Sequence, residues 1–307
     1  MKLSPEAERF LAQGVDRLVS LAGMLAARDL PFSVVRTGKE RHLILRLGRG
    51  SPRLALAAHY DRYAGSPGML DNSCACLQLV EFAARLAAPG TGGEPRNAGR
   101  QGAGPEGAEP EGAEPRPPGV EGPSLLFLFT DGEENPALQG ASGQGAYALA
   151  TAVSRRLGPR SAMPPVLVLD VTGRGDTLLL SSAPAALLER NGMGGTALAE
   201  GHRRLRGLAL AAAARARLGE PASLELPWSD DLGLVLGGVP ALTVSLLPDA
   251  EARAFPSRSP RTWSYLHSPE DGPSLAWDSS FDLMAAFLDG VAEELRQGGR
   301  ALGRDSL

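Results

Sequence analysis

The sequence predicts an α/β protein of three layers, in which helices cover both faces of a mostly parallel mixed sheet. Short apolar runs alternate along the chain with segments of helical periodicity, the order expected of β–α units. Several of these runs are apolar throughout, as is typical of strands buried on both faces of a sheet. The clearest runs are residues 54–58, 124–130, 166–169 and 241–245.

The remaining elements follow from the same two patterns. An N-terminal amphipathic helix is predicted over residues 4–27, with Ser4 as N-cap and Pro5 at the first helical position. Apolar residues at helical spacing predict further helices at residues 72–87, 145–156, 184–191, 195–218 and 279–297. Additional short strands are predicted at residues 32–35, 42–47 and 178–180.

Residues 89–123 differ in composition from the rest of the chain. Gly, Pro, Glu and Ala dominate this segment in imperfect repeats of Gly-Ala-Glu-Pro-Glu. Such a composition has too little apolar surface to offset the entropy of ordering, so we expect disorder. Because loop-closure entropy grows slowly with length, a surface insertion here costs little. We therefore predict one domain over residues 1–307 with an insertion at 89–123.

Bulk composition limits the classes of partner. A net charge of -4 over 307 residues gives no basic surface for nucleic acid. No uncharged apolar run approaches the ~20 residues needed to cross a bilayer, and the polar, acidic start does not resemble a signal peptide. The two cysteines, Cys74 and Cys76, are too close in sequence to join distant parts of the fold. We expect a reduced, cytoplasmic protein with no nucleic-acid or membrane partner, and nothing indicates its oligomeric state.

Histidine and carboxylate side chains stand after the predicted strands. In open α/β sheets, binding sites form outside the carboxyl ends of the strands, so these side chains are expected in one crevice. His and carboxylate groups ligate zinc, and two ions ~3.5–4 Å apart form a hydrolytic pair with a bridging carboxylate and a free carboxylate as base. The candidates are His59, Asp61, Asp71, Glu133, Glu134, Asp170 and His267.

Five stretches in order resemble the motifs of zinc-dependent aminopeptidases of the bacterial and leucyl aminopeptidase kind, which are related to glutaminyl-peptide cyclotransferases. They are His59-Tyr60-Asp61 with Asp71-Asn72, Phe129 to Glu134 with Gly140-Ala141-Ser142, Leu169-Asp170, Ser229-Asp230 with Gly238 to Ala241, and His267 to Asp271. The resemblance covers about residues 59–271 and implies a zinc-exopeptidase-like fold.

The resemblance also implies the metal ligands. His59, Asp71 and Asp170 would hold one zinc ion, and Asp71 would bridge to a second ion. Glu134 and His267 would complete the second ion. Two zinc ions are therefore expected for a peptidase, and one if the protein resembles the cyclases.

Two further roles follow from the same resemblance. Glu133 would be the general base, and Asp61 would support catalysis by hydrogen-bonding His59. Asp230 and Trp228 are assigned to substrate binding, although core packing explains a tryptophan there equally well.

The chain departs from the family where relatives contact substrate. Leu70 stands where the family usually has a first aspartate, and Asp231 stands where it usually has histidine. Residues 232–235 lack the usual Pro-Phe. The side-chain preference therefore does not follow from the resemblance.

Three functions fit these motifs. The leading hypothesis is a metal-dependent hydrolase, an aminopeptidase that removes N-terminal residues from a peptide or aminoacyl substrate by a metal-activated water. The alternative is a glutaminyl-peptide cyclotransferase with a single zinc ion on Asp71, Glu134 and His267. A non-catalytic relative comes third, because every ligand position is filled.

Overall fold

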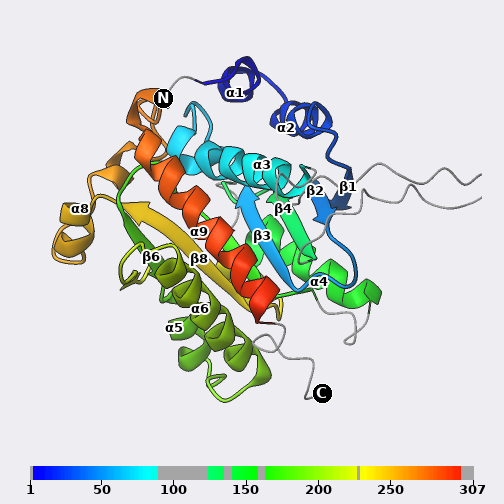
Figure 1. Ribbon diagram of the computed structural model, residues 1–307, viewed down its shortest axis with the longest axis vertical. Helices are drawn as coiled ribbons and strands as arrows, with labels where there is room; N and C mark the ends of the chain where they lie inside the picture. The colour runs from blue at the N-terminus through cyan, green and yellow to red at the C-terminus, as the bar shows by residue number, and fades with distance from the viewer. Residues whose placement is uncertain (1–2, 89–123, 135–139, 158–162, 227–228, 299–307) are drawn as a thin grey trace, which may run out of the picture.

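The structure is a computed structural model that describes residues 3–88, 124–134, 140–157, 163–226 and 229–298. Its strands form an eight-stranded mixed sheet in the order β1-β2-β4-β3-β5-β8-β6-β7 (Figure 1). The strands are β1 (Phe32–Thr37), β2 (Glu40–Leu47), β3 (Leu54–His59), β4 (Leu125–Thr130), β5 (Val166–Leu169), β6 (Thr177–Ser181), β7 (Ala222–Leu224) and β8 (Ala241–Leu247). The predicted α/β sandwich is confirmed.

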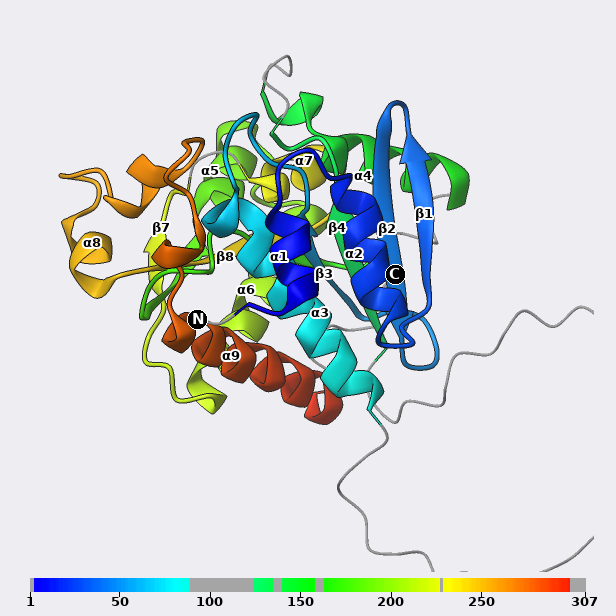
Figure 2. The same ribbon diagram turned by 90° about the horizontal axis from the view of Figure 1, so that it is seen from above.

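Helices cover both faces of the sheet, as the uninterrupted apolar strands predict. In β3, Leu54, Leu56 and Ala58 enter one core cluster, whereas Ala55 and Ala57 enter the other. The first face is covered by α3, α6 and α9, and the second by α4 and α7; Figure 2 shows α3 and α9 on the opposite side of the sheet from α4 and α7. These helices are α3 (Cys74–Ala87), α4 (Gly145–Leu157), α6 (Ala197–Arg215), α7 (Asp230–Leu236) and α9 (Asp278–Gln297).

The register of the central strands aligns the ends that carry the candidate site. Strand β3 pairs in parallel with β4 and with β5, so that His59 lies opposite Thr130 and Ala57 lies opposite Val168. Two residues further on, Asp170 is therefore level with His59. Parallel pairing thus brings residues that follow three different strands to one edge of the sheet.

The N-terminal helix predicted over residues 4–27 is two helices. They are α1 (Pro5–Leu11) and α2 (Arg17–Ala26). Ser4 caps α1, as predicted, and its hydroxyl accepts a backbone N–H. The chain then turns through Gly14 at φ 75°, a conformation that glycine adopts easily, and Asp16 caps α2. The helical spacing of apolar residues continued across this turn, which is why the break was missed.

Among the strands and α-helices of the described residues, three short ones were not predicted. They are β7, α7 and α8 (Asp249–Ala254), whereas α5 (Ala183–Arg190) agrees with the prediction. The predicted insertion at 89–123 lies outside the described residues. The elements on its two sides, α3 and β4, pack on or belong to the same sheet. In the described part of the chain, none of the helices has the length and apolar character that a bilayer span requires.

The aromatic core under α3 gives a test of this packing. Phe127 in β4 is fully buried, and its ring centroid lies 6.1 Å from that of Phe82 in α3. Phe127→Ala is expected to lower the free energy of unfolding by about 3–5 kcal/mol. Phe32→Ala, at a side chain that is 37% exposed on the edge strand, should cost far less. Urea denaturation measures both, and equal losses would contradict this packing.

Candidate metal centre

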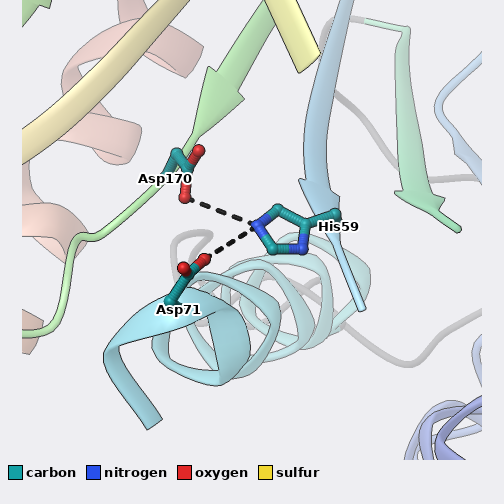
Figure 3. Close-up of side chains that lie close together, drawn as sticks. All are labelled: His59, Asp71 and Asp170. Carbon is teal, nitrogen blue, oxygen red and sulfur yellow. Dashed lines mark ion pairs between the residues drawn. The ribbon is translucent and has the colours of Figure 1, made fainter. Parts of the chain in front are cut away.

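The buried imidazole of His59 forms the centre of a first triad. Its Nε2 lies 3.1 Å from Oδ1 of Asp71 and 3.6 Å from Oδ1 of Asp170 (Figure 3). His59 ends β3, Asp170 follows β5, and Asp71 lies in the turn before α3. The register of β3 and β5 and the turn before α3 therefore bring together three of the five predicted ligands.

Asp71 also belongs to a second triad. Its other oxygen, Oδ2, lies 3.2 Å from Nε2 of His267, and that nitrogen lies 3.1 Å from Oε2 of Glu134. In each triad the possible ligand atoms lie within 4.8 Å of one another. A carboxylate that faces a different histidine with each oxygen has the arrangement required of a bridging ligand.

The donor atoms of both triads fit bound cations. Within the described residues, neither ring nitrogen of His59 has a hydrogen-bond partner, and Oδ1 of Asp170 and Oε1 of Glu134 also lack one. Buried polar atoms are nearly always satisfied, so unpartnered ligand atoms around a shared centre indicate a place for an ion. A set of imidazole nitrogens and carboxylate oxygens suits zinc.

The electrostatics of the two histidines favour positive charge. Burial alone would lower the pKa of His59, but nearby carboxylates, Asp170 foremost, raise it well above its usual value. Hydrogen bonds to Asp71 and Glu134 raise the pKa of His267 to about 10. Burial would raise the pKa of Asp71, yet the two histidines lower it. Bound metal ions would supply the positive charge that protons provide otherwise.

Glu133 lies next to both triads. Together with His59 and Glu134 it forms a third group of possible ligand atoms, and Gln144 donates to its Oε1 over 3.3 Å. Burial, followed by the charges of neighbouring carboxylates, raises the pKa of Glu133 well above its usual value. A raised pKa makes a carboxylate a stronger proton acceptor, as a general base requires. Its assignment as the base stays a prediction.

Asp61 lies beside His59 and also contacts the segment that carries Glu134. Its Oδ1 is 3.5 Å from Nδ1 of His59, which is longer than an ordinary N–H···O bond. Its Oδ2 accepts the backbone N–H of Glu134 over 2.9 Å. The predicted hydrogen bond from His59 is therefore not formed, although Asp61 lies beside the ring and holds the backbone of a residue in the second triad.

Sequence reasoning gave no role to two residues that hold Asp71. The carboxylate of Asp271 accepts the N–H groups of Leu70 over 2.7 Å and of Asp71 over 3.2 Å. Asn72 donates from Nδ2 to the carbonyl of Leu169 over 2.8 Å, which joins the Asp71 turn to the end of β5. Asp271 and Asn72 both belong to the motifs found in the sequence, and this was the signal that could have identified them. The pairing of Asp271 with residues about 200 positions earlier has no local signature.

The predicted substrate contacts receive less support. Asp230 is fully buried, accepts the hydroxyl of Thr130 and does not face the cavity described below, so its placement does not support substrate binding. Trp228 lies outside the described residues. Asp231, where relatives have histidine, is buried and accepts the N–H of Thr243 over 3.0 Å. The first turn of α7 directs this carboxylate inward. It therefore binds the backbone of β8 and is not available to a substrate.

A cavity of about 380 Å³ opens beside the two triads. Its apolar wall consists of Val171, Leu226, Trp263 and Leu266. Small hydroxyl side chains and Tyr63 complete the wall away from the ligands. None of the described residues that line it is lysine or arginine.

Comparison with known sequences assigns the family. The sequence profile of peptidase family M28 matches residues 43–290. The chain belongs to peptidase family M28. This assignment confirms the metallopeptidase-type hydrolase that the five motifs predicted. No curated protein sequence matches the chain significantly.

Solved structures share the fold of this M28 chain at low sequence identity. Legionella pneumophila LapA aminopeptidase has a TM-score of 0.62 at 15% identity, with 94% of this chain and 70% of that chain covered. Porphyromonas gingivalis glutaminyl cyclase has a TM-score of 0.59 at 13% identity, covering 94% and 95%. Acidobacteriales bacterium glutaminyl cyclase has a TM-score of 0.58 at 18% identity, covering 95% and 92%. At these identities the likeness shows the fold alone.

The support that Asp271 gives to Asp71 can be tested by removal. Asp271→Ala leaves two buried N–H groups without their acceptor, at about 1–3 kcal/mol each, and should lower unfolding free energy accordingly. It should also weaken zinc binding by about 10- to 100-fold, as loss of a group that supports a ligand does. Denaturation and zinc titration measure these effects. Glu270→Ala, at an exposed neighbour, is the control, and equal behaviour of the two variants would contradict the role of Asp271.

Zinc binding at the second triad is expected to strengthen as pH rises. The pKa of His267 is raised to about 10, so its ring carries a proton at neutral pH that zinc must displace. Below that pKa, apparent affinity should rise about tenfold per pH unit for each proton released. Chelator competition between about pH 7 and pH 9 measures the slope. An affinity for this ion that does not change between these pH values would count against the assignment.

Proposed function

We propose that this M28 chain is a two-zinc aminopeptidase. The observation that carries the proposal is the carboxylate of Asp71, whose two oxygens face His59 and His267 separately. One group of ligand atoms therefore lies on each side of a shared carboxylate. A zinc pair held there would polarise the scissile carbonyl and activate the attacking water.

The charge of the cavity supports cleavage at the amino end of a peptide. Among the carboxylates that line the cavity, Glu133 is not a proposed zinc ligand, so its charge is free to attract an α-ammonium group. Recognition of a C-terminal carboxylate would require a cationic side chain, such as an arginine that donates two hydrogen bonds to it. None of the described residues that line the cavity is lysine or arginine. The substrate proposed is therefore a peptide with a free N-terminus.

Glu133 is the residue best placed to move protons in this proposal. It lines the cavity beside the ligands and has no opposing cation of its own among the described ion pairs. It would take the proton of the attacking water and transfer it to the leaving amine. A positioned base of this kind contributes about 10²- to 10⁴-fold to the rate.

Glutaminyl-peptide cyclisation is the second candidate function. It is favoured by the cyclase structures, which match nearly the whole of both chains. That reaction would need one zinc ion on Asp71, Glu134 and His267, and it leaves the facing pair of His59 and Asp170 unexplained. We therefore place it second.

The cytoplasmic location also remains a proposal, supported by two free, buried cysteines.

One experiment separates the two functions. Zinc-loaded protein is incubated with a short peptide that begins with leucine and another that begins with glutamine, and products are identified by mass spectrometry. We expect free leucine, at a rate lowered about 10²- to 10⁴-fold by Glu133→Gln. Glu220→Gln, at an exposed site, is the control. Loss of ammonia from the glutamine peptide, with the leucine peptide intact, would replace the proposal with the cyclase.

A further inference from the structure

The two candidate histidine ligands are supported very differently. His59 is completely buried at a strand end; Oδ1 of Asp61 lies 3.5 Å from its Nδ1, too far for an ordinary hydrogen bond, so burial is what fixes this ring. The side chain of His267 is 52% exposed, and its backbone has φ 57° in a loop. Both of its ion pairs within the described chain, with Asp71 and Glu134, are made by Nε2, so that Nδ1 has no carboxylate partner there. Metal-binding histidines usually have such a partner, which fixes the orientation of the ring.

An aromatic ring packs on the face of the His267 imidazole. The ring of Tyr63 stacks on His267 with a centroid distance of 4.9 Å and an interplanar angle of 15°. Tyr63 also lines the cavity beside the ligands. A stacked contact restricts rotation of the imidazole plane about its side-chain bonds, and a hydrogen bond to Nδ1 would impose the same restriction.

Tyr63 itself stands on a firmly held loop. The guanidinium of Arg62 donates to the carbonyls of Leu11 and Pro67 over 2.8 and 3.1 Å, and to that of Ala12 over 2.9 Å. The carbonyl of Tyr63 accepts the N–H of Ser66 over 3.1 Å. These bonds join the loop to the end of α1, so the tyrosine ring has a fixed base from which to hold its neighbour.

We propose that Tyr63 is a positioning residue, which holds the imidazole of His267 in the orientation that the second triad requires. The inference rests on the proposed zinc pair and adds to it a support for the exposed histidine. Stacking needs the ring face of Tyr63 and not its hydroxyl. The Phe variant should therefore retain the function, and the Ala variant should lose it.

Zinc affinity, measured by competition with a chromophoric chelator, tests the proposal. The ion lost in His267→Ala identifies the second site. In Tyr63→Ala we expect the affinity of that ion to fall about 10- to 100-fold, while the other ion stays bound. Tyr63→Phe should bind both ions as the unmutated protein does. Tyr147→Ala, on α4, is the matched control and should also bind normally. Thermal unfolding of the zinc-free variants reports any general loss of structure.

Several outcomes would overturn the inference. Unchanged affinity in Tyr63→Ala would show that the stack does not position His267. Equal weakening in Tyr63→Phe would assign the effect to the hydroxyl, and equal weakening of both ions would indicate a general structural role. In each of these cases the zinc pair proposed above would stand. Absence of zinc from the unmutated protein would refute the metal centre itself, and this inference with it.

Discussion

The carboxylate of Asp71 is shared between two imidazoles, and the rest of the site is arranged around that constraint. A rotation of this one side chain would remove a ligand from both triads at once. Its backbone is therefore fixed from two directions, by Asp271 across the chain and by Asn72 at the end of β5. Burial of so many carboxylates in one crevice is costly in free energy unless positive charge lies between them and balances theirs. Protonated histidines or metal ions would satisfy the same electrostatic demand.

The parts of the structure that are determined by residues close together in the sequence could be predicted. The apolar runs of β3 and β5 are local, and His59 and Asp170 stand at their ends, so the sequence predicts both the strands and the positions of these candidate ligands. The orientations of Asp230 and Asp231 depend instead on how α7 packs against β4 and β8. The family resemblance supplied their positions in the chain but not the direction of their side chains. The acceptor role of Asp271 required the fold itself.

The departures from the family pattern surround the ligands without replacing them. Leu70, where relatives have an aspartate, is fully buried in an apolar cluster with Met69, Cys74 and Val171. The side chain of Leu70 thus packs in this cluster, while its backbone N–H donates a hydrogen bond to Asp271. The candidate ligand atoms are all present in this chain, and the turn that carries Asp71 packs on an apolar cluster.

The N-terminal helices are part of that support, although the family profile begins only at residue 43. Arg17 of α2 is buried, donates to the carbonyl of Tyr60 and to the hydroxyl of Ser73, and lies 3.9 Å from the ring centroid of Phe10. These acceptors offset the cost of burying a guanidinium. They also connect α2 to the segments on both sides of the Tyr63 loop. The N-terminal region therefore constrains the candidate ligands from behind, and the shape of the candidate metal centre depends on residues that precede the range matched by the family profile.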